Sequence, residues 1–243
     1  MGTTTQVNTE PSPAQTHFDE YAENYDAALN QGLSATGEAK DYFAAGRLQW
    51  LARCLSQLGE HPQRVMDYGC GDGSSSELLL GLNKAESLIG VDTSEKSLEL
   101  ARKNYADKNC SFLPIAQYSP KQQVDLVYCN GVFHHIPLGG RAAALDFVRR
   151  SLRPGGLFAL WENNPWNPGT RYVMSRIPFD QGAVMLTPPE ARALVRQGGF
   201  QVVRTDSLFF FPRQLKWLRW MEPHLWRLPL GGQYQVLCRR VEK

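Results

Sequence analysis

The 243-residue sequence lacks most features that mark secreted, membrane and nucleic-acid-binding proteins. Its five cysteines are scattered without CxxC spacing, which favours unpaired thiols in a reducing compartment. No apolar run reaches the ~20 residues of a membrane-spanning helix. The opening "MGTTTQVNTEPSPAQ" lacks the basic and apolar regions of a signal peptide. The formal net charge is only +2, and no concentrated basic patch indicates a nucleic-acid partner. We therefore expect a cytoplasmic protein with a small-molecule partner.

The composition is that of a globular domain, with 42% hydrophobic and 21% charged residues. Residues 1–13 are polar and contain proline, so we expect a disordered tail. From residue 14 onward, Phe18, Tyr21, Tyr25 and Leu29 recur at helical spacing, and a second helix is predicted over residues 38–58. Residues 14–60 therefore form an N-terminal helical segment ahead of a main domain at 61–243.

The main domain alternates short apolar runs with helical patterns. Strands are predicted at 64–69, 87–92, 110–116, 124–131 and 156–162, with helices at 74–82, 94–106, 139–152 and 187–198. Residues 200–211 and 231–241 are predicted to be an antiparallel pair of strands that closes one edge of the sheet. This order predicts an α/β fold of the Rossmann-like, doubly wound kind, with helices on both faces of a mostly parallel sheet.

A glycine-rich turn, "VMDYGCGDGSSS", follows the first predicted strand. Its spacing is G-x-G-x-G, and Ser74 stands where a dinucleotide fingerprint would have its third glycine. Asp67 would repel a pyrophosphate but attract an ammonium or sulfonium group. Asp92 follows the glycines by about 20 residues, where a carboxylate can bind both hydroxyls of a ribose. A ligand with a ribose, a positive centre and no phosphate is S-adenosylmethionine (SAM).

These stretches resemble the motifs of class I SAM-dependent methyltransferases, in the small-molecule branch of bacterial enzymes. "VMDYGCGDG" is similar to their cofactor loop, "IGVDTSEKSLELAR" to their ribose-binding strand and helix, and "VDLVYCNGVFHHI" and "SLRPGGLFAL" to their fourth and fifth strands. The resemblance covers residues 60–162. It implies a seven-stranded sheet whose last strand is antiparallel, and SAM as the cofactor.

The resemblance also implies the cofactor contacts. The methionine moiety would be held by Asp67, Gly69, Cys70, Gly71 and Gly73, the ribose by Asp92 with Thr93 beside it, and Asn130 would lie next to the cofactor. The family's usual acid near the adenine is missing in "FLPIAQYSP", so either the amide of Gln117 or backbone alone would serve. Tyr25, on a segment similar to the family's cofactor-covering helix, is a further predicted contact; core packing is the alternative.

Two adjacent histidines in "FHHI" are the candidate catalytic residues. Both follow the fourth predicted strand, and an imidazole can accept a proton near neutral pH. Because adjacent side chains point in different directions, we expect only one of the two histidines to reach the pocket. We favour His135 over His134 as the base. A structural, hydrogen-bonded pair is the alternative. We predict no metal site, because no Cys, His or carboxylate cluster near them in the sequence completes one.

The loop over residues 161–186 is the predicted acceptor-binding segment. It is polar and rich in proline, which argues against an ordinary helix and favours a functional loop, with a purely structural loop as the alternative. Polar contacts are predicted from Glu162, Asn163 and Asn164, an anion contact from Arg171, and ring stacking from Trp166 and Tyr172. We expect O-methylation of a hydroxylated, sugar-like or lipid-linked small molecule.

A basic, tryptophan-rich stretch covers residues 213–228. Trp217, Trp220 and Trp226 alternate with Arg213, Lys216, Arg219 and Arg227. Such a segment can lie on an anionic membrane surface, or it can pack its tryptophans on the domain with its basic side chains outward.

Other functions remain open at this level. A protein of this fold could bind SAM without transferring a methyl group, or could methylate nitrogen or carbon. A dehydrogenase is disfavoured by the glycine spacing and by Asp67. The sequence leaves the oligomeric state open.

Overall fold

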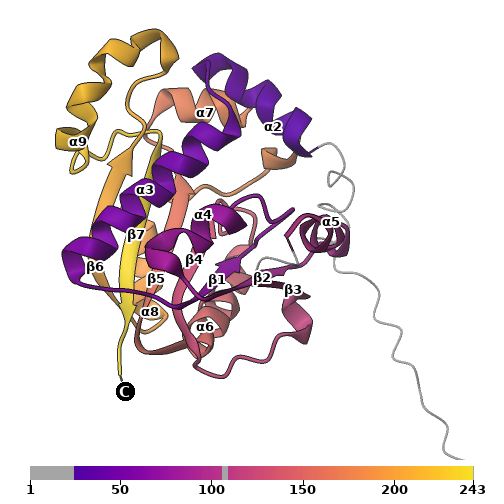
Figure 1. The fold of residues 1–243 in the computed structure, drawn as a ribbon. Coiled ribbons are helices and arrows are strands. Elements are labelled where there is room, and N and C mark those ends of the chain that lie inside the picture. Colours follow the sequence, from indigo (N-terminus) through magenta and orange to yellow (C-terminus); the bar gives the residue numbers. More distant parts are fainter. Residues whose placement is uncertain (1–24, 106–108, 243) are drawn as a thin grey trace, which may run out of the picture.

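The computed structural model describes residues 25–105 and 109–242, with every side chain except those of residues 25–27 and 83. Its centre is a seven-stranded sheet with the order β3-β2-β1-β4-β5-β7-β6 (Figure 1). The strands are β1 Arg64–Tyr68, β2 Ser87–Asp92, β3 Cys110–Pro114, β4 Val124–Asn130, β5 Leu152–Asn163, β6 Phe200–Leu208 and β7 Gln233–Arg240. The predicted fold class is confirmed.

Only β7 among these strands runs antiparallel to its neighbours. It pairs with β5 on one side and with β6 on the other, while β1 to β5 pair in parallel. The prediction of an antiparallel last strand is therefore correct, but β7 lies inside the sheet and β6 forms the edge. β5 and β6 both pair antiparallel with β7 and therefore run in the same direction. The connection from β6 to β7 thus begins at the end of the sheet that carries the carboxyl ends of β1 to β5.

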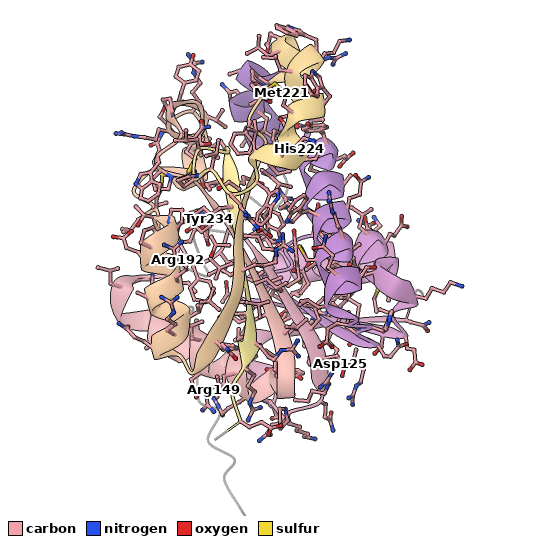
Figure 2. The ribbon with its side chains drawn as sticks, turned by 90° about the vertical axis from the view of Figure 1, so that its left-hand side faces the viewer. Asp125, Arg149, Arg192, Met221, His224 and Tyr234 are labelled. Atoms are coloured by element: carbon pink, nitrogen blue, oxygen red, sulfur yellow. The ribbon has the colours of Figure 1, made fainter. Side chains whose placement is uncertain are left out.

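Helices cover both faces of the sheet. They are α2 Tyr25–Leu33, α3 Lys40–Leu58, α4 Ser76–Leu80, α5 Glu95–Tyr105, α6 Arg141–Ser151, α7 Pro168–Met174, α8 Pro188–Gln197 and α9 Glu222–Leu225. Short 3₁₀ segments are Ser34–Thr36, Leu82–Lys84, Ile115–Gln117, Leu138–Gly140, Pro178–Asp180 and Arg213–Met221. Helix α3 and helix α8, which carries Arg192, lie on opposite sides of the sheet (Figure 2).

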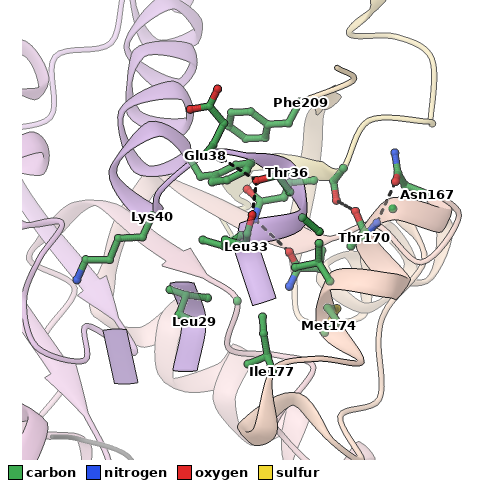
Figure 3. A pocket seen from close by; sticks show the side chains of 18 of the residues that line it. Leu29, Leu33, Thr36, Glu38, Lys40, Asn167, Thr170, Met174, Ile177 and Phe209 are labelled. Carbon is green, nitrogen blue, oxygen red and sulfur yellow. Dashed lines mark hydrogen bonds between the residues drawn. The ribbon is translucent and has the colours of Figure 1, made fainter. Parts of the chain in front are cut away.

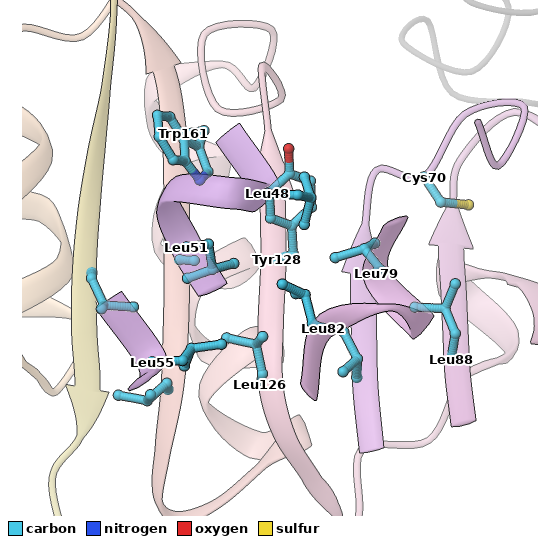
Figure 4. Close-up of a cluster of buried hydrophobic side chains, with 14 of the residues drawn as sticks. Leu48, Leu51, Leu55, Cys70, Leu79, Leu82, Leu88, Leu126, Tyr128 and Trp161 are labelled. Atoms are coloured by element: carbon cyan, nitrogen blue, oxygen red, sulfur yellow. The ribbon is translucent and has the colours of Figure 1, made fainter. Parts of the chain in front are cut away.

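Alternation along the strands divides the core into two clusters. In β4, Leu126 and Tyr128 belong to the cluster beneath α3, α4 and α5, whereas Val127 and Cys129 belong to the cluster beneath α6 and α8. This is the period of two that a strand buried on both faces requires. Figure 4 shows the first cluster, with side chains of α3 packed over the central strands. All five cysteines are buried, and none of them forms a disulfide bond in the described part of the chain.

Local capping explains several of the boundaries. The Ser94 hydroxyl accepts a hydrogen bond from the Ser97 N–H and so caps the start of α5. Thr187 and Glu190 form a reciprocal capping box at the start of α8. The prediction that the loop after β5 contains no ordinary helix is wrong, because α7 forms there. The Asn167 side chain accepts from the Thr170 N–H, and Pro168 occupies the first turn, where its missing N–H costs nothing.

The N-terminal helical segment is joined closely to the sheet. Leu48, Leu51 and Leu55 of α3 are at most 3% exposed and belong to the first core cluster. The role of this segment as a cofactor-covering lid stays a prediction, and its first part, with Tyr21, lies outside the described residues. Within the described residues, no helix is long and apolar enough to cross a membrane.

The packing of α3 predicts the effect of truncating one of its buried side chains. Leu51→Ala should lower the free energy of unfolding by about 2–5 kcal/mol, because it leaves a cavity between α3 and the sheet. Urea unfolding measures the change. Leu138→Ala, at a side chain that is 70% exposed, is the matched control and should change stability by less than about 0.5 kcal/mol. Equal effects of the two substitutions would contradict the packing of α3.

Candidate active site

A cavity of about 870 Å³ lies at the carboxyl ends of the central parallel strands. Strand order reverses between β1 and β4, since β2 and β3 extend to one side and β5 to the other. In open α/β sheets, ligands bind at this switch point. Asp67 of β1, Asp92 of β2 and Asn130 of β4 all line the cavity. The parallel topology thus brings together residues that are far apart in the sequence.

The glycine loop forms one wall of this cavity with its backbone. Gly69, Gly71 and Gly73 all have positive φ. A Cβ at Gly69 would lie 2.3 Å from Val132 Cγ2, whereas a Cβ at Gly71 would meet nothing within 4 Å. Gly69 is therefore required by close packing. Gly71 leaves open space beside bare backbone, where a ligand can approach.

Two carboxylates set the electrostatics of the cavity. Asp67 is 3% exposed, and burial together with the nearby Asp92 raises its pKa to about 8. Asp92 accepts hydrogen bonds from the N–H groups of Gly71 (2.8 Å) and Ser94 (2.9 Å). Asp92 therefore holds the glycine loop. A buried carboxyl with a raised pKa suits a cationic ligand and disfavours a phosphate.

The other predicted cofactor residues divide between cavity and surroundings. Cys70, Thr93 and Asn130 line the cavity, whereas Gly73 does not; a Cβ on Gly73 would lie 3.0–3.3 Å from side-chain atoms of Ala101, Tyr105 and Phe112. Gln117 is exposed and also does not line the cavity. Ile115, two residues earlier, does, since the chain turns into a 3₁₀ segment directly after β3. The predicted amide contact of Gln117 is thus not supported. The side chain of Tyr25 lies outside the described residues.

A second cavity, of about 390 Å³, adjoins the first. Residues from α2, α3, α7 and the segment after β6 line it (Figure 3), and its wall is largely apolar. Apolar lining side chains include Leu29, Leu33, Phe43, Met174, Ile177 and Phe209. Asn130, Gly131 and His135 line both cavities. The two spaces therefore meet at the carboxyl end of β4.

A chain of charged and polar side chains stands at this meeting point. Nδ1 of the buried His134 lies 2.6 Å from Oε2 of Glu162, whose Oε1 accepts from the Phe133 N–H. Nε2 of His134 lies 3.5 Å, and Nε2 of His135 lies 3.3 Å, from Oδ1 of Asp180. The order of contacts is Glu162, His134, Asp180 and His135.

The two histidines differ in protonation. Burial by itself would lower the pKa of His134, but the carboxylates of Glu162 and Asp180 outweigh it and raise the pKa to about 10. Burial lowers the pKa of His135, and the charge of His134 lowers it further, against the hydrogen bond to Asp180. The two histidines hold the pKa of Asp180 below its usual value in spite of burial. At neutral pH, His134 is therefore a cation, Asp180 an anion and His135 neutral.

This cluster also has the geometry of a metal site. One nitrogen of each histidine and a carboxylate oxygen of Asp180 lie within 4.8 Å of one another. The sequence next to the histidines offers no further ligand, but the fold brings Asp180 to them from a distant loop. The absence of a metal site stays a prediction. In the observed geometry, Glu162 and Asp180 both accept from His134. A protonated imidazole has no lone pair for a metal, so a metal could bind here only if His134 lost its proton.

Only some of the residues predicted to bind the acceptor line the second cavity. Asn163 and Tyr172 line the second cavity, but Glu162, Asn164, Trp166 and Arg171 do not. Glu162 is buried as the partner of His134. Asn164 is buried because its amide donates to the carbonyls of Pro229 and Gly231. Trp166 and Arg171 are exposed. Glu162 and Asn164, which the sequence pattern suggested as substrate contacts, thus form hydrogen bonds within the protein instead.

Sequence reasoning missed Asp180 and the aromatic residues after β6. Asp180 is the only acidic residue between Glu162 and Glu190, and this isolation was the available signal. Phe209, Phe210 and Phe211, which directly follow β6, line the second cavity. Only the placement of β6 at the edge of the sheet brings them there.

Comparisons with known proteins agree with this architecture. Residues 65–156 match a family model described as a methyltransferase domain. The chain is 30% identical over 122 residues to trans-aconitate 2-methyltransferase of Rhodopseudomonas palustris (strain BisB18), covering 50% of this chain and 47% of that protein. The corresponding protein of Methylobacterium nodulans is 35% identical over 116 residues, covering 48% and 44%. The match spans about half the length of these relatives.

A solved structure extends the likeness to nearly the whole chain. The N-methyltransferase NodS of Bradyrhizobium japonicum, in complex with S-adenosyl-L-homocysteine (SAH), superposes with a TM-score of 0.65 at 14% identity, covering 94% of this chain and 99% of that one. At this identity the likeness concerns the fold.

The matched domain, the fold and the cofactor loop agree with one another. Over residues 65–156 the chain is similar to a methyltransferase-domain family, and its fold is that of a methyltransferase solved with SAH.

The buried pair of Glu162 and His134 predicts a stability effect. Glu162→Gln should lower the free energy of unfolding by roughly 3–5 kcal/mol, because it removes one partner of a buried ion pair. The folded pKa of His134 is about 10, against about 6.5 in the unfolded chain. The stabilisation that the variant loses is therefore full below pH 6.5 and declines as pH rises toward 10.

Urea unfolding of wild type and variant between pH 6 and 10 measures both the size and the pH dependence. Asp146→Asn is the matched control, since Asp146 is 45% exposed and pairs with Arg149 and Arg150 on the surface of α6. Its cost should stay within about 0–1 kcal/mol. A pH-independent loss in Glu162→Gln would contradict a charged His134.

Proposed function

We propose that this protein transfers the methyl group of SAM to a hydroxyl of a small acceptor that has an apolar body. The carrying observation is that the two cavities meet at Asn130, Gly131 and His135. The larger cavity has the glycine backbone, the carboxyls and the volume for the cofactor. The smaller one is lined for the acceptor. The reacting atoms would meet beside His135.

The residues of the larger cavity fit the cofactor. Asp67 is a buried carboxyl suited to the amino group of the methionine moiety, Gly71 leaves room at the backbone, and Asp92 places a carboxylate at the end of β2, where ribose hydroxyls could donate to it. When bound, SAM supplies an electrophilic methyl group. The part of the chain is to orient the acceptor, exclude water and accept a proton.

His135 is the proposed base. Its Nε2–H donates to Asp180, which leaves the lone pair of the neutral ring on Nδ1. Nδ1 then takes the proton of the acceptor hydroxyl. Asp180 stabilises the imidazolium that forms, while the cationic His134 holds Asp180 ionised. Glu162 and Asp180 are positioning residues, since they act through the histidines.

The lining of the smaller cavity decides the class of acceptor. Lys40, Arg47 and Arg219 are the Lys and Arg residues that line it within the described chain. Arg47 donates to Tyr128 and Gln233, Arg219 pairs with Glu38, and Lys40 with Asp72. A tricarboxylate such as trans-aconitate needs cations that can pair with it. Engaged cations among apolar side chains favour a less charged acceptor, such as a lipid-linked one, over a polyacid or a sugar.

A cofactor-binding protein that transfers no methyl group is the second candidate. It is favoured by one observation, that His134 is fully engaged in a buried network of ordinary structural contacts. Intact binding of SAH with no methyl transfer to any hydroxylated, amino or carboxylate acceptor would support it. Transfer to amines alone would instead indicate an N-methyltransferase.

The raised pKa of Asp67 predicts how cofactor affinity depends on pH. At pH 6 the free protein holds Asp67 protonated, because its pKa is about 8. Binding an ammonium group requires the ionised form. Affinity for SAH should therefore rise from pH 6 to 7.5, by up to about tenfold per unit. Isothermal titration calorimetry of wild type and Asp67→Asn measures this slope.

Asp67→Asn should remove most of that pH dependence. Asp146→Asn is the matched control, because Asp146 does not line the cavity and pairs with Arg149 and Arg150 on the surface of α6. The control should keep the slope. A wild-type affinity that is independent of pH would remove Asp67 from the ammonium site, and failure to bind SAH at any pH would overturn the proposed function.

The base role of His135 predicts the kinetics of transfer. His135→Gln should slow methylation of a hydroxyl about 10²–10⁴-fold and leave SAH affinity unchanged. SAH release with a panel of apolar hydroxylated acceptors, and with trans-aconitate for comparison, measures it. In the wild type, activity should fall on acidification through the lowered pKa of His135, because the protonated ring cannot accept a proton.

Asp180→Asn separates a positioning role from a structural one. Asp180 raises the pKa of His135, so the acid limb of the pH profile should move to lower pH in this variant while the maximal rate falls. His61→Gln, at an exposed histidine, is the control and should behave as wild type. Removal of metals by chelation should leave the rate unchanged; loss of activity that Zn²⁺ restores would reassign the cluster to a metal.

A further inference from the structure

The connection between β6 and β7 (residues 209–232) leaves large apolar side chains in solvent. Trp217 is 67% exposed and Trp220 is 72% exposed. Leu215, Leu228 and Leu230 of the same connection are 40–56% exposed. Exposed clusters of this kind mark interaction sites in folded proteins. Trp226, by contrast, packs against Trp50 and beneath Arg204, so only one of the three tryptophans anchors the connection.

The 3₁₀ geometry aligns the exposed tryptophans. The segment Arg213–Met221 is a 3₁₀ helix with a kink at Leu215. Side chains at i and i+3 of a 3₁₀ helix eclipse, so Trp217 and Trp220 stand on one column. The neighbouring column carries Lys216 and Arg219. Arg219 turns inward to Glu38 and the Tyr42 ring, while Lys216 is exposed.

The charge of the exposed surface is of one sign. Arg213, Lys216 and Arg227 are exposed. Glu222 is the only acidic residue between 209 and 232, and its carboxylate accepts from the N–H groups of Phe210 and Phe211. That acid therefore faces the protein interior. Glu222 thus adds no free negative charge to the exposed side chains of this connection. Exposed tryptophans beside cations complement a surface with an apolar interior and an anionic boundary, such as that of a lipid bilayer.

This surface adjoins the acceptor cavity. Phe209, Phe210, Phe211 and Pro212 begin the connection and line the smaller cavity. Met221 and His224 lie at the end of the molecule opposite Asp125 near the start of β4 (Figure 2). The exposed tryptophans therefore stand at the end of the sheet that carries both cavities. A partner surface bound to these tryptophans would lie next to the smaller cavity, where an amphiphilic acceptor could enter.

We propose that residues 213–230 dock this protein on an anionic lipid bilayer, with Trp217 and Trp220 inserted at the interface. The observation that carries it is the column of two exposed tryptophans flanked by exposed cations, next to the apolar acceptor cavity. The docking deepens the proposed function, since it gives an amphiphilic acceptor a route to the cavity. It requires no methyl transfer, and each can therefore fail by itself.

Vesicle sedimentation of the full chain tests the docking. The probes are vesicles of phosphatidylcholine alone and of phosphatidylcholine mixed with phosphatidylglycerol. Binding should appear with the anionic vesicles and shift tryptophan emission to shorter wavelength. Trp217→Ser/Trp220→Ser should weaken it by at least about tenfold, given the burial energy of a large apolar side chain. Lys216→Gln should weaken it about fivefold, the effect of one cation near such a surface.

Matched controls distinguish docking from general stickiness. Val241→Ser removes an apolar side chain that is 46% exposed after β7, and Lys103→Gln removes a cation on α5, near the opposite edge of the sheet. Both should bind vesicles as wild type does. Unchanged melting temperature and SAH affinity in the double tryptophan variant would show that it is folded.

Two results would overturn the proposal. One is equal recovery of wild type and double tryptophan variant with anionic vesicles, or no binding by wild type. The other is a dimer in sedimentation velocity that the tryptophan substitutions dissociate, which would assign the surface to a second copy of this chain. Vesicle binding without methyl transfer would retain the docking and reject the proposed function, whereas transfer without vesicle binding would do the reverse.

Discussion

The candidate site depends on one buried contact, the 2.6 Å hydrogen bond between Glu162 and His134. Glu162 ends β5 on its buried side, and its other oxygen accepts from the Phe133 N–H. The same carboxylate therefore fixes the backbone turn after β4 and the charge of the imidazole. Since His134 then attracts Asp180, the loop after α7 is held against the turn. Asp180 in turn orients His135 at the boundary of the two cavities.

A second constraint is the pair of carboxyls in the larger cavity. Burying Asp67 near Asp92 raises the pKa of Asp67, which is unfavourable for an ionised group and is relieved when a cation binds. Asp92 meanwhile stabilises the glycine loop through Gly71. One carboxyl thus organises the protein and the other is suited to the ligand.

The connection between β6 and β7 joins cavity and surface. Its first residues close the acceptor cavity, its middle exposes tryptophans, and its last residues are bound by Asn164 and Asn167 through the carbonyls of Pro229, Leu230 and Gly231. Helix α7 and this connection therefore support each other. Part of the loop predicted to bind substrate therefore supports the connection between β6 and β7 through the hydrogen bonds of Asn164 and Asn167. Most of the residues that line the smaller cavity thus lie outside residues 65–156, the part that matches the methyltransferase-domain family.

The sequence by itself determined the strands of the sheet, the helices that flank it apart from α7, and the cofactor loop. These follow from local signals: alternation along Leu126–Cys129, glycines at Gly69 and Gly71, and carboxyls at strand ends, which the parallel topology brings to one edge. Tertiary structure alone decided the roles of Glu162, Asn164 and Asp180. A polar side chain in a loop can face substrate or satisfy a buried partner, and only the packing of distant segments determines which. The exposure of Trp217 and the burial of Trp226, nine residues apart in one basic stretch, were decided in the same way, by which of them met Trp50 on α3.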